Sequence, residues 1–122
     1  MIKRVGIVGL GMIGGSLAKL FSEKISDLFL VAVDTNQVSI ESAIETGLIS
    51  NGSTDLSFFK DLNLELIIIA TPIAHVINTI QDLSEMILTP VIFSDVASIK
   101  SFDLTIQLKK EHSIVWGHPM AG

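Results

Sequence analysis

Glycines and one aspartate near the start of the chain occur in an order that suits nucleotide chemistry. Residues 9–14 have the sequence GLGMIG, which places Gly9, Gly11 and Gly14 at Gly-x-Gly-x-x-Gly spacing. Glycines let the backbone bend sharply and approach a pyrophosphate, which the free N–H groups of a helix N-terminus bind. Asp34 follows at the spacing of about 20 residues expected for a carboxylate that accepts hydrogen bonds from a ribose. The pattern therefore predicts a dinucleotide site.

A lone Gly-x-Gly-x-x-Gly is weak support, because an ordinary tight turn between a strand and a helix uses glycine in the same way. The context favours the nucleotide interpretation: the apolar run 2–8 precedes the glycines, and a helix-like stretch begins at Met12. Asp34 ends a second apolar run, 28–33, although a carboxylate there could also cap the next helix. No Arg or Lys occurs in the three residues after Asp34 to meet a 2′-phosphate, so we expect NAD rather than NADP.

A serine and a histidine late in the chain could handle a proton. Ser98 follows the apolar run 91–93, and His118 follows the run 113–116 and precedes Pro119. Proline restricts the residue before it to extended backbone, which would fix the direction of His118. A neutral imidazole, with an ordinary pKa of about 6.5, can accept the proton that a hydroxyl loses on oxidation. Ser98 could instead simply begin a helix, and His118 could be structural.

Five short apolar runs must position these residues. They are rich in Ile and Val and alternate with helix-like stretches: residues 2–8, 28–33, 64–70, 91–93 and 113–116. Continuous apolar runs are typical of parallel strands that helices cover on both faces. The sequence therefore predicts an α/β fold, a doubly wound, mainly parallel, Rossmann-like sheet with right-handed crossovers. In such a sheet the residues just after each strand share the ligand-binding edge.

Cap signals mark the ends of the predicted helices. Gly47 ends a helix that begins near Asn36. Thr71 as a cap and Pro72 at the first helical position begin a later one, and both could also contact the cofactor. Apolar residues at helical spacing define one face of the first and of the later helix: Ile13, Leu17, Leu20 and Phe21, then Ile73, Val76, Ile77, Ile80 and Leu83.

Residues 48–63 have the weakest pattern. The segment 50–53, with the sequence SNGS, predicts a turn, and a weak third strand is expected near residues 48–50. Thr54 and Asp55 are expected to cap a short helix that extends through Phe59.

Two further histidines are expected to lie outside the chemistry. His75 lies on an apolar helix face, where a packed or half-buried side chain is more common than a catalytic one. His112 follows Lys110 and Glu111 at a helix end and is expected to be solvated.

Composition excludes several classes of function. The 122 residues include 8 Lys and Arg against 13 Asp and Glu, a formal net charge of −5, so a nucleic-acid or anionic-membrane partner is not expected. The absence of cysteine excludes a disulfide framework and a thiolate metal site, and it fits a reducing cytoplasm; we expect no metal. The sequence contains no run of about 18 apolar residues, the length that a helix needs to span a membrane. The length suits a single domain.

Taken together, four segments resemble one family, the prephenate and arogenate dehydrogenases of tyrosine biosynthesis. These segments are residues 9–18, 70–72, 95–100 (DVASIK) and 117–122 (GHPMAG), and they extend along the whole chain. The glycine segment is shared with many oxidoreductases, whereas the last two segments are far more specific. By this resemblance His118 is similar to the family's catalytic histidine. Ser98 is similar to the serine that hydrogen-bonds near the substrate hydroxyl and the nicotinamide.

The resemblance implies an NAD-dependent enzyme that decarboxylates prephenate oxidatively to 4-hydroxyphenylpyruvate. Hydride would pass from the ring carbinol carbon to NAD while His118 takes the hydroxyl proton, and loss of carbon dioxide makes the ring aromatic. The residues expected to contact the cofactor are Gly9, Gly11, Met12, Ile13, Gly14, Asp34, Thr71 and Pro72.

The chain lacks the arginines that would bind the two carboxylates of prephenate. Its one arginine, Arg4, precedes the first predicted strand, at the edge of the sheet opposite the cofactor. The family has a second, helical domain after the GHPMAG segment, with anion contacts and most of a dimer interface. We therefore expect residues 1–122 to be the truncated cofactor-binding half of a cytoplasmic homodimer, poorly active alone.

Other functions stay open at this point. Arogenate could replace prephenate as the small-molecule substrate, or the chain could belong to another NAD-dependent oxidoreductase, such as a hydroxy acid dehydrogenase or an imine reductase. A dinucleotide-sensing domain would use the same glycine turn without a reaction, and a purely structural domain would not bind NAD.

Overall fold

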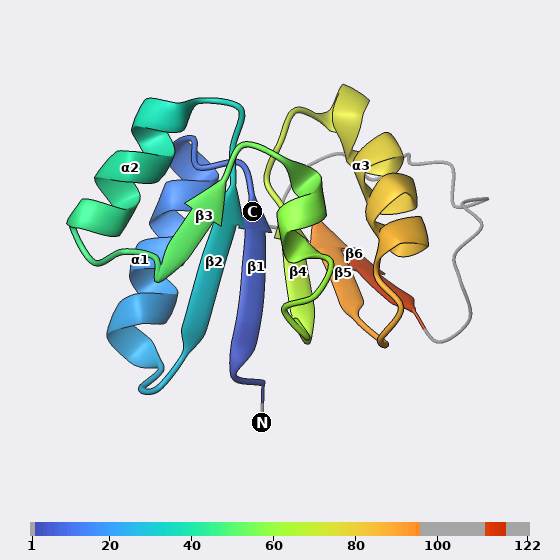
Figure 1. The fold of residues 1–122 in the computed structure, drawn as a ribbon, viewed down its shortest axis with the longest axis horizontal. Helices are drawn as coiled ribbons and strands as arrows, with labels where there is room; N and C mark the ends of the chain where they lie inside the picture. Colours follow the sequence, from blue (N-terminus) through green and yellow to red (C-terminus); the bar gives the residue numbers. More distant parts are fainter. Residues whose placement is uncertain (1, 96–111, 117–122) are drawn as a thin grey trace.

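The strands of this domain form one parallel sheet (Figure 1). The computed structural model describes residues 2–95 and 112–116. Within those ranges the strands are β1 (Arg4–Val8), β2 (Phe29–Val33), β3 (Asn51–Ser53), β4 (Leu66–Ile69), β5 (Ile92–Asp95) and β6 (Ser113–Trp116). Their order is β3-β2-β1-β4-β5-β6, and every neighbouring pair is parallel. The predicted doubly wound sheet is confirmed, and its order reverses at β1, which adjoins both β2 and β4.

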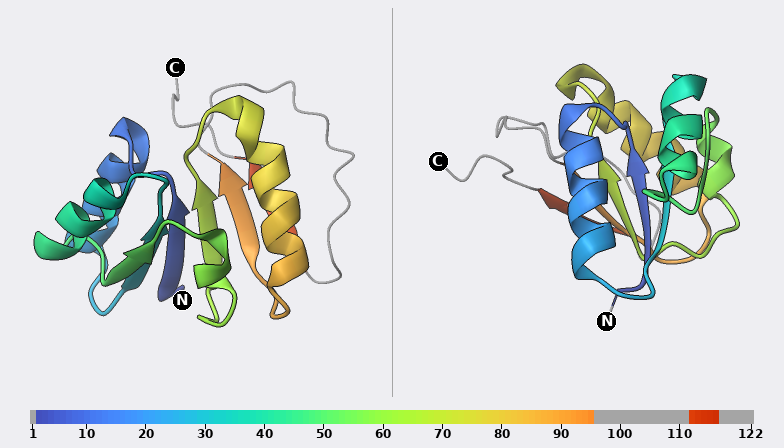
Figure 2. Two further views of the ribbon diagram at one scale, coloured as in Figure 1. Left: turned by 45° about the horizontal axis from the view of Figure 1, so that its top comes forward. Right: turned by 90° about the vertical axis from the view of Figure 1, so that its left-hand side faces the viewer.

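Helices cover both faces of the sheet. They are α1 (Met12–Lys24), α2 (Gln37–Glu45) and α3 (Ile73–Met86), with a short 3₁₀ helix η1 (Leu56–Phe59). Residues of α1 and α2 share one buried cluster with the sheet, and residues of η1 and α3 share the other. Figure 2 shows α1 and η1 on opposite sides of β1. Among the described residues, no helix combines the length and apolarity needed to cross a bilayer.

The central strands are continuously apolar because both of their faces are buried. In β1, Val5 and Ile7 belong to the cluster under α1 and α2, whereas Val8 belongs to the cluster under η1 and α3. In β4, Ile68 faces the first cluster and Ile69 the second. Alternate side chains of a strand point to opposite faces, so a strand between two helical layers needs apolar residues at every position.

The predicted third strand exists, but its predicted position and the turn predicted at residues 50–53 are wrong. Residues 51–53 of this SNGS segment form the edge strand β3 rather than a turn, so the strand begins directly after the expected position 48–50. It pairs in parallel with β2, with Gly52 opposite Ala32. A Cβ on Gly52 would lie 2.9 Å from the Ala32 carbonyl oxygen and 3.0 Å from Cγ2 of Ile40. Glycine thus lets α2 and β2 approach this polar edge, where pairing with β2 overrides the local turn preference.

The helix boundaries follow local capping chemistry. The Asn36 Oδ1 accepts hydrogen bonds from the N–H groups of Val38 (2.9 Å) and Ser39 (3.3 Å) at the start of α2, and Gly47 follows that helix with a φ of +75°. Asp55 caps η1 by accepting from the N–H of Ser57 at 2.9 Å. These ends are as predicted.

The start of α3 and the exposed face of α1 differ from the prediction. Pro72, not Thr71, is the N-cap residue of α3, and no side chain caps this helix. On α1, Ile13 and Leu20 are exposed, so only part of the predicted apolar face is buried. The side chains of Val76, Ile80 and Leu83 on α3 are fully buried, as their spacing predicts.

His112 is partly buried rather than solvated. Its Nδ1 accepts a hydrogen bond from the Val91 N–H at 3.3 Å, and its Nε2 lies 3.0 Å from the Ile87 carbonyl oxygen. Because Nδ1 accepts, the proton is on Nε2, which donates to Ile87. The ring also meets Phe93 edge-on, with centroids 5.6 Å apart. Its charged neighbours in sequence suggested solvent, but the backbone groups of the loop before β5 needed partners.

We expect Gly6→Ala to lower the free energy of unfolding by about 1–3 kcal/mol. A Cβ at Gly6 would lie 2.8 Å from Cδ1 of Leu64 and 3.0 Å from Cζ of Phe59. Urea unfolding followed by circular dichroism measures the change. Gly15→Ala, at a position within α1, is the control. A Cβ there would have the Leu10 carbonyl oxygen as its nearest atom, at an unstrained 3.6 Å. This control should gain about 0.5–1 kcal/mol, and equal losses in both variants would contradict a packing role for Gly6.

Candidate functional site

The turn between β1 and α1 depends on glycines at two positions. Gly9 has a φ of +96°, and a Cβ there would lie 2.9 Å from the Ala70 carbonyl oxygen. Gly14, in the first turn of α1, lies so close to Gly9 that a Cβ would be 1.8 Å from the Gly9 carbonyl oxygen. A side chain at Gly14 would separate α1 from the end of β1, and one at Gly9 would push the turn away from the segment after β4.

Gly11 leaves the start of α1 open. It is the N-cap residue, no side-chain hydrogen bond caps the helix, and a Cβ at Gly11 would have no atom within 4 Å. The first N–H groups of a helix have no intrahelical acceptor, and they carry the positive end of the helix dipole. An anion could therefore approach the backbone of α1 closely at Gly11.

The Asp34 carboxylate joins this turn to the end of β2. Its Oδ2 accepts the Leu10 N–H at 2.6 Å, and its Oδ1 accepts the Asn36 N–H at 2.8 Å. Asn36 rather than Asp34 caps α2, which removes the alternative that Asp34 is merely a helix cap. Each carboxylate oxygen can accept a further hydrogen bond, so Asp34 can hold the turn and still bind hydroxyl groups of a ligand.

The segment after β4 forms the other wall. The Ala70 N–H donates to the Val8 carbonyl at 2.8 Å, and the Thr71 Cγ2 would lie 3.3 Å from a Cβ on Gly9, so the methyl group faces the glycine turn. The Thr71 Oγ1 is buried and has no hydrogen-bond partner within the described residues. Pro72 is exposed. A buried hydroxyl without a partner destabilises the protein. Such a group is therefore consistent with a binding site in which a ligand supplies the missing hydrogen bond.

These walls enclose a groove of about 580 Å³ at the carboxyl edge of β1, β2 and β4. Its lining includes Gly9, Gly11, Asp34, Thr71, Pro72 and His75. The groove lies where β1 adjoins both β2 and β4, the point at which open parallel sheets bind their ligands.

The predicted cofactor residues divide into two groups. Gly9, Gly11, Asp34, Thr71 and Pro72 line the groove, whereas Met12, Ile13 and Gly14 do not. Met12 and Ile13 are 89% and 45% exposed at the start of α1, and Gly14 is buried against Gly9.

The two predicted catalytic residues, Ser98 and His118, lie outside the described residues. The catalytic roles of Ser98 and His118 therefore stay predictions.

Sequence reasoning missed the contribution of α3. His75 is exposed and lines the groove together with Thr79, instead of being packed or half-buried. Positions 75 and 79 are four residues apart and therefore share one stripe of the helix. Two polar residues at that spacing, directly after a segment predicted to border the cofactor, are a signal that could have identified this face.

Arg4 lies at the opposite edge of the sheet, as its place in the sequence predicts. Its Nε and one terminal nitrogen donate to the Leu62 carbonyl oxygen at 2.9 and 2.6 Å. The guanidinium carbon lies 4.2 Å from the centroid of the Phe29 ring. Arg4 thus stabilises the amino edge of the sheet and is not available to a ligand in the groove.

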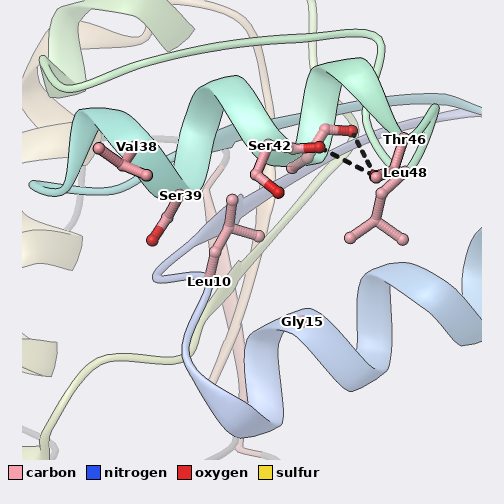
Figure 3. A pocket seen from close by; sticks show the side chains of 8 residues that line it. Leu10, Gly15, Val38, Ser39, Ser42, Thr46 and Leu48 are labelled. Carbon is pink, nitrogen blue, oxygen red and sulfur yellow. Dashed lines mark hydrogen bonds between the residues drawn. The ribbon is translucent and has the colours of Figure 1, made fainter.

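A second hollow, of about 380 Å³, lies between α1 and α2 (Figure 3). Leu10 and Val38 contribute apolar side chains, and Ser39 and Ser42 contribute hydroxyls. The Thr46 Oγ1 already donates within α2, at 3.0 Å to the Ser42 carbonyl oxygen. None of the described residues that line this hollow is titratable, so it does not resemble a catalytic site.

Comparison with known proteins shows the family to which this chain belongs. A family model described as "Prephenate dehydrogenase, nucleotide-binding domain" matches residues 17–122. A prephenate dehydrogenase of Bacillus subtilis (strain 168) is 29% identical over 121 residues, which cover 95% of this chain and 32% of that protein.

Two solved structures are also similar. Prephenate dehydrogenase from A. aeolicus, in complex with hydroxyphenyl propionate and NAD⁺, has a TM-score of 0.85 and 26% identity, covering 100% of this chain and 43% of that one. Synechocystis arogenate dehydrogenase has a TM-score of 0.72 and 33% identity, covering 80% and 34%. The chain thus spans less than half the length of these relatives.

We expect Asp34→Ala to lower the free energy of unfolding by about 1–3 kcal/mol, because it leaves the Leu10 and Asn36 N–H groups without their acceptor. Urea unfolding measures the loss. The matched control is Asp61→Ala, at an exposed aspartate, which should change stability by less than about 0.5 kcal/mol. A loss no larger than that of the control would mean that the carboxylate does not hold the turn.

Proposed function

The chain belongs to the prephenate dehydrogenase family through its nucleotide-binding domain, and from that premise we propose that its groove binds NAD for a dehydrogenase reaction. The observation that carries this proposal is the Asp34 carboxylate fastened to the glycine turn in one groove. That arrangement offers a ribose acceptor and a helix N-terminus within reach of one dinucleotide.

The groove residues fit the parts of the cofactor. The uncapped N-terminus of α1 at Gly11 would bind the pyrophosphate, and the Asp34 carboxylate would accept hydrogen bonds from the ribose hydroxyls. Thr71 and Pro72 would border the cofactor from the β4 side. Met12 and Ile13, exposed at the start of α1, would flank it outside the groove, and Gly14 would act by keeping α1 close to β1.

The reaction we propose is the oxidative decarboxylation of prephenate to 4-hydroxyphenylpyruvate. Bound NAD would supply the hydride acceptor. His118 would take the proton of the substrate hydroxyl, and Ser98 would hydrogen-bond near that hydroxyl. Departure of the ring carboxylate as carbon dioxide would leave its electron pair in the ring, which becomes an aromatic phenolate, and return of the proton to that oxygen would complete the product. The groove residues would contribute by holding the two reactants in a reactive orientation.

Recognition of the substrate would require residues beyond this domain. Arg4 is engaged at the amino edge, far from the groove, and the chain spans less than half the length of its relatives. We propose that a helical second domain binds the substrate carboxylates and forms most of a homodimer interface. The complete enzyme would act in the cytoplasm, in the biosynthesis of tyrosine.

Arogenate is the second candidate substrate, because an arogenate dehydrogenase is among the similar structures, at 33% identity. Arogenate and prephenate differ in the side chain, where an amino group replaces a keto group. That difference would be recognised by the residues that bind the side chain, so assays with both substrates decide between them.

Calorimetric titration of residues 1–122 should show binding of NAD and binding of NADP at least about tenfold weaker. The 2′-phosphate of NADP would approach the Asp34 carboxylate, and the next three residues offer no cation to offset the repulsion. Asp61→Ala should leave both affinities unchanged. Absence of NAD binding would contradict the proposed function, and equal affinities would contradict the role of Asp34.

In a full-length protein that contains this domain, His118→Asn should lower kcat about 10²-fold or more, because the proton acceptor is lost. Formation of NADH with prephenate measures the effect, and calorimetry should show NAD affinity within about twofold of the wild type. Unchanged turnover in this variant would contradict the role of His118, whereas a wild-type protein that binds NAD but forms no NADH would favour a dinucleotide-sensing domain. By the same assay, normal turnover by residues 1–122 alone would contradict the need for a second domain.

A further inference from the structure

His75 places an aromatic side chain in the groove that the cofactor roles above do not use. It lies in the first turn of α3, where its backbone N–H donates to the Pro72 carbonyl oxygen at 2.9 Å. The imidazole is exposed to the groove, and within the described part of the chain no hydrogen bond, ion pair or ring contact engages it. Thr79, one turn further along α3, lines the same groove.

The position of Asp34 divides the groove into two parts. A ribose held there carries its phosphates on C5′ and its base on C1′, so the two groups leave in different directions. The phosphates would extend toward the N-terminus of α1, which packs on one face of the sheet. The base would therefore occupy the part of the groove that is bordered by η1 and α3, which pack on the other face of the sheet.

The lining of this second part suits a flat, largely apolar heterocycle. Leu56 provides an apolar wall, Thr54 and Thr79 provide hydroxyls, and His75 provides a planar ring. No carboxylate, lysine or arginine is among the described residues that line this side of Asp34. Flat rings pack against each other with favourable dispersion and quadrupole interactions, in addition to the apolar area that they bury.

We infer that His75 packs its imidazole against the adenine base and contributes to the affinity of the site for adenine nucleotides. The inference rests on the proposed binding of NAD in the same groove, and it adds a base-contacting residue to it. Loss of the ring should weaken binding of the adenosine half about 3- to 10-fold.

Calorimetric titrations of residues 1–122 with NAD and with AMP test this role. His75→Ala should weaken both ligands by the same 3- to 10-fold factor, because AMP contains the adenosine half alone. His75→Phe should retain most of the affinity, since it keeps a flat ring, whereas His75→Gln should behave like His75→Ala. Asn78→Ala, at an exposed residue of α3 that does not line the groove, is the matched control and should bind like the wild type. Circular dichroism verifies that each variant is folded.

The outcomes separate this inference from the proposed function. If the wild type binds NAD and AMP but His75→Ala binds both equally well, the inference is overturned and NAD binding stands. Weaker NAD binding with unchanged AMP binding would also overturn it, since His75 would then act on the nicotinamide half. Rescue by Gln but not by Phe would overturn the ring contact. A wild-type chain that binds neither ligand would overturn the proposed function and this inference together.

Discussion

The first turn of α1 lies directly against the carbonyl oxygen of Gly9, and this contact determines how the rest of the site is built. No residue with a Cβ fits at Gly14, because that atom would lie 1.8 Å from the oxygen. The close approach brings the helix start to the end of β1, where the sheet order reverses. The same tightness recurs on the other side of the turn, where a Cβ at Gly9 would meet the Ala70 carbonyl. Strand, helix and the β4 loop thus meet at one point, and the groove opens beside it.

Asp34 connects this point to β2, and in the proposed site the same carboxylate would also bind the ribose. One carboxylate accepts from the backbone of both the glycine turn and the loop after β2. Because such hydrogen bonds are charge-assisted, they hold the two loops in register before any ligand arrives. A ribose that used the remaining acceptor positions would meet a preorganised site and would not have to order the loops itself.

In the proposed nucleotide site, the two helical layers would recognise different parts of the cofactor. α1 presents backbone N–H groups, which suit phosphates whatever base they carry. α3 presents side chains, His75 and Thr79, at the other end of the same groove, where a base can be distinguished. This division follows from the doubly wound topology, which places α1 and α3 on opposite faces of the sheet while their N-termini share its carboxyl edge.

Local sequence determined much of this structure. Apolar runs predicted the central strands and the parallel sheet, and the spacing of Gly9, Gly11 and Gly14 predicted the turn between β1 and α1, because these signals act over a few residues. The hydrogen bond from Asp34 to that turn was not predicted. Tertiary structure decided the rest. β3 exists because residues 51–53 pair with β2, and His112 is partly buried because its partners, Ile87 and Val91, come from a distant loop. The orientation of α3 on the sheet exposes His75 to the groove. These outcomes depend on partners far away in the chain, which local patterns do not contain.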